Sequence, residues 1–347
     1  MKLLKSIPLF FPITFISSII IGTLSLFMIK NSSFPIWISW DAVALMIICS
    51  GFFAYNISFY TKENNSIKFL NYKLNWLSEI FILMALLGTL LGFFHVLGGM
   101  ENPPEADVDP MAYLGVMVSI SLLTIIYGFA YAFSTNIYKK TLINLIPNGD
   151  KNNRNTNSNF RIGTVISLIS FIGIWVFAFH LTSQSVGLSI LHMMKHNINY
   201  LIILLFLFPL FYKGDSLLNL FKSWFWYFKE EDNQIRYNIN YLTSLKNTIA
   251  IFYSLSFFIT PMLIYGGITS NTPPFFPLQN TVHLFFWGCV IILFLTIMQG
   301  QQVNKLFINT GEIIETDKFF ALKFYLVPLF IMYLYFSFCV VLGFVVI

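Results

Sequence analysis

Charged residues are scarce in this chain: 10% of its 347 residues are Asp, Glu, Lys or Arg, whereas an average soluble domain has about 25%. Hydrophobic residues make up 57% of the sequence. So few polar groups cannot cover a globular surface, which argues against a soluble enzyme. The net charge of +5 is small and indicates no nucleic-acid partner by itself.

Metal-ligand and catalytic motifs are also missing. The three cysteines, Cys49, Cys289 and Cys339, lie inside apolar runs without a CxxC pair, which argues against disulfides and zinc and favours small buried hydrophobic residues. His192 and His196 lie four residues apart but lack carboxylate or cysteine partners nearby, so we expect no metal site. Since no Walker loop, nucleophile elbow or zincin motif occurs, we expect neither enzymatic activity nor a cofactor.

Long apolar runs dominate the sequence instead. A segment exposed to lipid must satisfy its own backbone hydrogen bonds, and none of these runs alternates as a strand does, so each predicts a helix. The expected fold is all-α and polytopic, with about nine transmembrane helices. The first run is uncharged and lacks a cleavage site, which favours a retained span over a signal peptide. The runs are 8–29, 37–60, 76–99, 111–138, 162–185, 197–212, 244–268, 281–300 and 319–345.

The distribution of basic residues predicts the orientation. With the N-terminus in the cytoplasm, all 20 Lys and Arg residues except Lys30 and Lys195 fall on the cytoplasmic side. The loop at 101–109 is acidic and falls outside. We therefore expect a multi-pass protein of the cell inner (plasma) membrane, with the lipid bilayer as a partner.

A weak internal repeat divides the chain. The third span of each half ends in a glycine pair, Gly98-Gly99 and Gly266-Gly267, and the segments 140–144 and 305–309 match where the fourth spans end. The alternative is chance similarity between two hydrophobic segments. Four spans per unit give both units the same orientation, as in parallel repeats. The predicted organisation is a four-span unit at 1–147, a cytoplasmic linker at 148–160, a degenerate second four-span unit at 161–310 and a C-terminal transmembrane helix at 311–347.

Small and hydroxyl-bearing residues concentrate in the third and fourth spans. Glycines four residues apart allow helices to approach closely, and the hydroxyls beside them line a narrow polar seam. Such a seam is more often packing than a conduit. The residues are Gly88, Thr89 and Gly92 in the third span, and Thr124, Tyr127 and Gly128 in the fourth.

At these residues the chain resembles the MotA/TolQ/ExbB proton-channel family, and its MotA branch most closely. The resemblance lies in Gly-Thr-x-x-Gly at 88–92, the following 93–97, Asp109-Pro110, and Leu-Thr-x-x-Tyr-Gly at 123–128, in the family's order. It covers residues 8–145 and extends only faintly into the second unit.

The resemblance implies a homo-oligomeric ring of subunits around a single-span MotB/ExbD-like partner, whose aspartate carries the proton. It makes Thr89 and Thr124 pore-lining. Ile125 stands where the family has a second threonine, and the cytoplasmic domain that contacts a rotor is reduced to about 61–75. Isoleucine cannot hold water or a carboxylate as a hydroxyl does.

Three functions follow as hypotheses. The first is a channel subunit that, with its partner, couples proton flow to mechanical or transport work. The second is a non-conducting structural or scaffold subunit of the same fold, which Ile125 favours. The third is a small-solute transporter, against which the scarcity of charges within the spans argues.

Glu79 and Lys246 are the remaining candidate site residues. Both lie within a few residues of the cytoplasmic end of a span, at similar positions in the two units. Charged side chains so placed either reach the interface or pair with each other. Glu79 and Lys246 are therefore a candidate ion pair between the units.

Overall fold

The computed structural model describes residues 42–59, 67–101, 110–145, 162–186, 230–269 and 275–314. In this part of the chain, all regular structure is helical, which confirms the all-α class. The predicted runs 8–29, 197–212 and 319–345 lie outside the described residues, as does the linker 148–160, so the count of nine stays a prediction. The six helices are α2 (Ala42–Ser58), α3 (Ile67–Glu101), α4 (Pro110–Leu145), α5 (Ile162–Val186), α9 (Asp232–Thr269) and α10 (Phe275–Thr310).

Several helix ends have an identifiable local cause. Pro110 is the first residue of α4, where its fixed φ suits a helix and its missing N–H costs nothing. Asp232 places a negative charge in the first turn of α9, next to the positive end of the helix dipole. Gly311 ends α10 with a φ of 75°, and its N–H donates to the Phe307 carbonyl at 2.9 Å.

Four of these helices are longer than the predicted spans. Helices α3, α4, α9 and α10 have 35, 36, 38 and 36 residues. At 1.5 Å per residue this is about 52–57 Å, against about 30 Å for the hydrocarbon core of a bilayer. Helix α9, for example, begins twelve residues before its predicted span at 244–268, and this polar extension contains Arg236. Each hairpin is thus long enough to project about 20 Å beyond a membrane.

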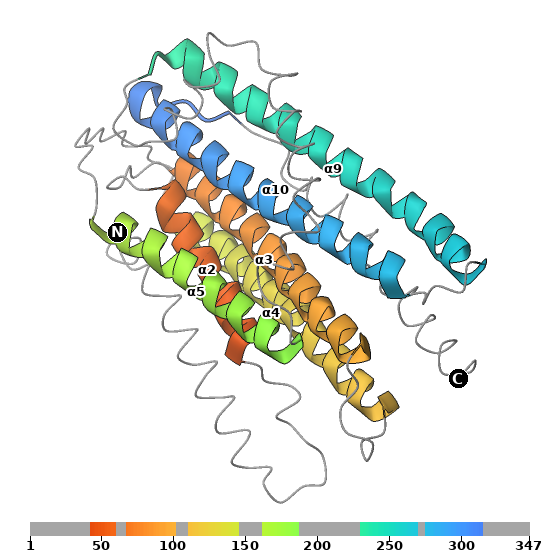
Figure 1. Cartoon of the computed structure of the whole chain (residues 1–347). Helices are drawn as coiled ribbons and strands as arrows, with labels where there is room; N and C mark the ends of the chain where they lie inside the picture. The colour runs from red at the N-terminus through yellow and green to blue at the C-terminus, as the bar shows by residue number, and fades with distance from the viewer. Residues whose placement is uncertain are drawn as a thin grey trace, which may run out of the picture.

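Helix α3 lies at the centre of the bundle (Figure 1). It forms an antiparallel hairpin with α4, and it also packs against α10, α2 and α5. Helix α9 packs against α10, so the second hairpin joins the rest of the bundle through α10 (Figure 1). Helix α5 covers α2 and α3 from the other side.

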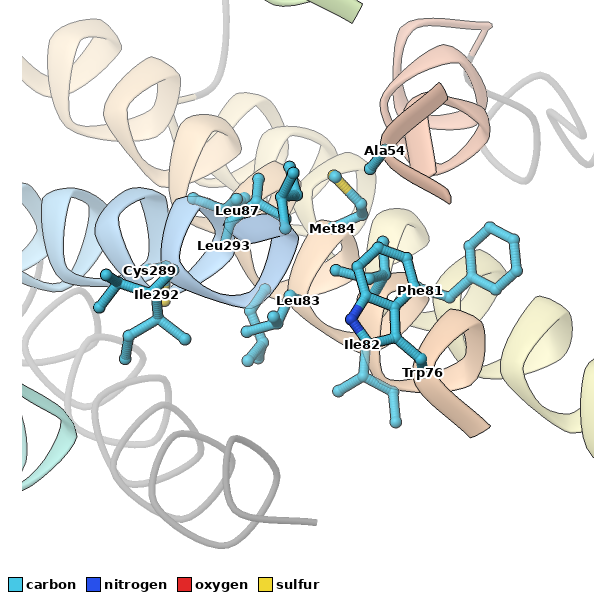
Figure 2. Packing of buried hydrophobic residues seen from close by; sticks show 14 of the residues in the cluster. Ala54, Trp76, Phe81, Ile82, Leu83, Met84, Leu87, Cys289, Ile292 and Leu293 are labelled. Carbon is cyan, nitrogen blue, oxygen red and sulfur yellow. The ribbon is translucent and has the colours of Figure 1, made fainter. Parts of the chain in front are cut away.

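The contact between α3 and α10 is apolar in its middle. Leu83 and Leu87 of α3 belong to the same buried cluster as Cys289, Ile292 and Leu293 of α10 (Figure 2). Two further contacts join α3 and α10 nearer the end of the bundle that carries Lys139 and Arg236, called the charged end below. The Trp76 indole N–H donates to the Thr296 carbonyl at 3.2 Å, and the rings of Phe69 and Phe307 stack with centroids 3.9 Å apart. The two hairpins thus share one core.

Two segments in this part of the chain, Lys68–Phe93 and Phe285–Thr310, are long and apolar enough to span a membrane. Helices α4 and α5 also carry large apolar side chains on their outward faces. Phe133 is 67% exposed and Ile169 is 65% exposed within the described residues. Exposed apolar side chains in such numbers are typical of a helix that faces lipid or another apolar segment.

Candidate functional site: the contact between α3 and α4

The backbones of α3 and α4 approach closely at two glycines. A Cβ atom built on Gly88 would lie 2.8 Å from the Thr124 Cγ2 atom, and one built on Gly128 would lie 2.3 Å from the Ala85 Cβ atom. Neither approach leaves room for a larger residue, since ordinary van der Waals contacts between carbon atoms are about 3.5–4 Å. Ala85, Gly88 and Thr89 are thus the residues of α3 against which Thr124 and Gly128 of α4 pack.

The two predicted pore-lining threonines meet at this crossing. The hydroxyl oxygens of Thr89 and Thr124 lie 2.7 Å apart. Thr89 is 0% exposed and Thr124 is 3% exposed. The pair is therefore enclosed between α3 and α4 within the described chain.

The direction of the hydrogen bonds follows from the number of available protons. A threonine hydroxyl has one proton to donate and can accept two hydrogen bonds. The Thr89 hydroxyl donates to the Ala85 carbonyl at 2.9 Å, one turn earlier in α3. While that bond is made, the only proton of Thr89 is engaged, and the hydrogen bond between the two threonines needs the Thr124 proton. For Thr89 to donate to any other group, its bond to Ala85 must first break.

Polar contacts continue along α3 and α4 toward their charged end. The Asn136 amide donates to the Ser78 hydroxyl at 3.3 Å, and the Ser78 hydroxyl donates to the Ala132 carbonyl at 3.4 Å. Closer to the end, the Lys139 ammonium donates to the Asn75 side-chain oxygen at 2.7 Å. The α3–α4 contact thus alternates between apolar packing and polar pairs from Thr89 down to Asn75.

The other predicted residues of this region lie around the crossing. Gly92, Ile125 and Tyr127 are half-buried. Ile125 and Tyr127 pack against the hydrophobic core. Ile125 thus contributes apolar contact, while the hydroxyl pair is made by its neighbour Thr124.

The structure also brings Glu79 and Lys246 together. The Lys246 ammonium lies 3.4 Å from the Glu79 carboxylate, with side-chain exposures of 3% and 12%. Lys246 also donates to the Gln299 side-chain oxygen at 3.3 Å, and the Gln299 amide donates to the Thr243 hydroxyl at 2.6 Å. This cluster, Glu79, Lys246, Gln299 and Thr243, joins α3, α9 and α10; it is called the ion-pair cluster below.

Sequence reasoning missed several of these residues. Ala85 lies three residues before Gly88, at a spacing that continues the small-residue stripe of α3, and this signal was available. The contacts of Ser78 with α4 and of Gln299 with Lys246 had no such signal, because they depend on the relative rotation of neighbouring helices.

Metal-ligating side chains do not gather anywhere in the described segments: no three His, Cys, Asp or Glu residues come together as a group that could hold an ion. The pair His192 and His196, at which the sequence predicts no metal site, lies outside these segments. Comparison with known proteins gave no match: no protein-family model, curated protein or solved structure matches this chain.

Proposed function

We propose that the chain is a multi-pass subunit of the cell inner membrane that couples proton flow to mechanical or transport work together with a single-span partner. In this proposal it is a MotA/TolQ/ExbB-like protein with a cytoplasmic N-terminus and about nine spans, arranged as two parallel four-span units and a C-terminal helix. Support for the membrane location comes from the two helices of sufficient length and hydropathy and from the apolar outward faces of α4 and α5.

The observation that carries the proposal is the buried hydroxyl pair of Thr89 and Thr124. Polar side chains within membrane-spanning helices are costly to place and usually serve packing or the handling of ions. Both threonines occupy positions that resemble the family's pore-lining threonines, and they lie 2.7 Å apart at the closest approach of α3 and α4. Two hydroxyls at one point can hold a partner's carboxylate or a water molecule between them.

Coupling would require the pair to open. The Thr89 hydroxyl donates to the Ala85 carbonyl, and a second proton is engaged in the hydrogen bond between the Thr89 and Thr124 hydroxyls. A partner's carboxylate would gain a donor only if one of these hydrogen bonds broke. Binding and release of the proton on that carboxylate would therefore be linked to a rearrangement at the α3–α4 contact.

A non-conducting scaffold subunit of the same fold is the second candidate. The observation that favours it is the same closed pair, because two hydroxyls that satisfy each other are sufficient to hold helices together. The apolar packing of Ile125 beside them also favours it. The two candidates differ in whether removal of a hydroxyl changes only stability or also proton flux.

Proton flux in liposomes separates them. The protein would be purified from its native membranes in mild detergent, and any co-purifying single-span protein with a carboxylate in its span would be reconstituted with it. Flux would be followed with an enclosed pH-sensitive dye under an applied membrane potential. The variants are Thr89→Val and Thr124→Val, which remove a hydroxyl at nearly constant volume, and Ile125→Thr, which adds the family's hydroxyl.

The matched control is Thr135→Val, because Thr135 is buried on the same helix and its hydroxyl donates to the Tyr131 carbonyl at 2.8 Å. We expect Thr89→Val and Thr124→Val to lower flux by about 10-fold or more, the effect of losing one hydrogen bond to a charged group. Thr135→Val should leave flux unchanged, and Ile125→Thr should raise it. Equal losses in Thr124→Val and Thr135→Val, or a stable complex without flux, would overturn the coupling role and favour the scaffold.

A further inference from the structure

A second line of polar residues runs along α10 where it faces α9. Gln299, Gln302, Lys305 and Asn309 recur at intervals of three or four residues and therefore lie on one side of α10. Gln299 belongs to the ion-pair cluster, and the other three continue from it toward the charged end of the hairpin. At 1.5 Å per residue, the line from Gln299 to Asn309 is about 15 Å long. We call it the α10 polar line.

At its charged end, the α10 polar line contacts acidic residues at or near the start of α9. Asn309 donates to the Asp232 carboxylate at 2.9 Å, and the Lys305 ammonium lies 3.7 Å from the Glu230 carboxylate. Beyond them, Arg236 pairs with Glu312, and both are exposed. The polar line therefore starts at the surface and leads inward to the ion-pair cluster.

The geometry of the ion pairs along this line is loose. Charge-assisted hydrogen bonds are usually about 2.7–2.9 Å long, and a polar contact beyond 3.5 Å is often bridged by water. The Lys246–Glu79 distance is 3.4 Å, and the Lys305–Glu230 distance is 3.7 Å. The Lys246 and Lys305 side chains are buried, and the Glu79 and Glu230 side chains are only 12% and 10% exposed, so competition with bulk solvent does not explain these long distances.

An unsatisfied polar atom near the line points to water as well. The Asn238 side-chain nitrogen on α9 is buried and has no hydrogen-bond partner in the described chain. Asn238 is 1% exposed. Buried polar groups are almost always hydrogen-bonded, and ordered water supplies the partner where protein does not.

We propose that the contact between α9 and α10 is a hydrated path, which admits water from the charged end of the hairpin as far as the Glu79–Lys246 pair. Its ligand is water, held by the side chains of the α10 polar line and by Asn238. The path ends at Gln299, because the next residue on the same face of α10, Leu295, is apolar and fully buried. Protons then exchange with the ion pair from one end of the bundle only. The path needs no partner protein, so it is independent of the coupling proposed above.

Silver ions test the path, because Ag⁺ reacts with thiols wherever water can carry it. Single cysteines would be introduced into a background in which Cys49, Cys289 and Cys339 are alanine, and reaction rates would be measured on the purified full chain in detergent. The test variants are Gln302→Cys on α10 and Thr243→Cys on α9. The controls are Val303→Cys, which is at the same depth on another face, and Leu295→Cys, which lies one turn beyond the proposed end.

We expect Gln302→Cys and Thr243→Cys to react at least about 100-fold faster than both controls, whose thiols react only when the bundle opens. Thermal unfolding of each variant identifies any that fails to fold, and the two test positions on different helices keep the comparison available. Reaction of both test thiols as slowly as Val303→Cys would overturn the path. Reaction of Leu295→Cys as fast as Gln302→Cys would overturn its proposed end and indicate general opening of the bundle.

Discussion

Replacement of Gly128 by alanine should destabilise the α3–α4 contact. The added Cβ atom would lie 2.3 Å from the Ala85 Cβ atom and 2.9 Å from the Phe81 carbonyl oxygen. Both neighbours are fixed to the backbone of α3, so neither can rotate away and the helices must separate. Overpacking of this kind costs about 1–3 kcal/mol.

Gly173 on α5 provides the matched control, because nothing lies within 4 Å of a Cβ atom built there. Alanine is favoured over glycine in a helix interior by about 1 kcal/mol, and both variants receive this gain. We therefore expect Gly173→Ala to be slightly more stable than wild type. The difference in the free energy of unfolding between Gly173→Ala and Gly128→Ala isolates the overpacking cost of about 1–3 kcal/mol.

The free energies would be measured by SDS titration of the protein in detergent micelles, with far-UV circular dichroism as the signal. Ala85→Gly serves as a compensating change, since it removes the atom that the new Cβ atom would approach most closely. In the Ala85→Gly background, Gly128→Ala should cost less than it does alone. The reasoning is refuted if Gly128→Ala is as stable as Gly173→Ala, or if Ala85→Gly brings no relief.

Three further predictions concern the polar and glycine contacts, and each can be checked by the same titration. Thr89→Val and Thr124→Val should each lower the free energy of unfolding by about 0.5–1.5 kcal/mol, because each removes the hydrogen bond between the two buried hydroxyls, and the double variant should cost clearly less than the sum. Additive effects would mean that the two hydroxyls are not bonded. Glu79→Gln and Lys246→Met should each cost about 3–5 kcal/mol by leaving an uncompensated buried charge, whereas the double variant should recover much of the loss. A double-mutant cycle without coupling would contradict that ion pair. Gly300→Ala should cost about 1–3 kcal/mol, because its Cβ atom would meet Ser58 Cβ at 2.9 Å and Trp76 Nε1 at 3.0 Å; wild-type stability would show that α10 is less tightly packed on α2 and α3.

The helical segments were predictable because their cause is local. Apolar runs such as 76–99 and 111–138 are long enough to span a bilayer, and the structure has a helix at each predicted run that it describes. Their ends were predicted less well. The polar extension of α9 back to Asp232 carries no proline or glycine to stop a helix, and its residues pack against α10 rather than against lipid.

The site was predictable where small residues and hydroxyls mark a close approach, as at Gly88 and Thr89, and where opposite charges lie at similar depths, as at Glu79 and Lys246. Other residues whose role depends on neighbours far apart in sequence were not predicted. Lys140 and Lys305 occupy matching positions in the predicted repeat, yet Lys140 is exposed whereas Lys305 is buried beside Glu230. A local pattern cannot distinguish these two lysines, since the difference lies in which helix covers each of them.

In the proposed membrane location, the two hairpins are long enough for one part of each to contact lipid and another part to contact water. Inside a bilayer, apolar side chains gain little by leaving lipid for one another, so packing there depends on shape and on polar pairs such as Thr89 and Thr124. In the projecting ends, which include the exposed pair of Arg236 and Glu312, water instead drives apolar side chains together. Urea should therefore loosen the projecting ends first, while the lipid-facing part of the same helices keeps its helicity. Because the helices are continuous, a movement of the projecting part would then be transmitted directly to the lipid-facing part.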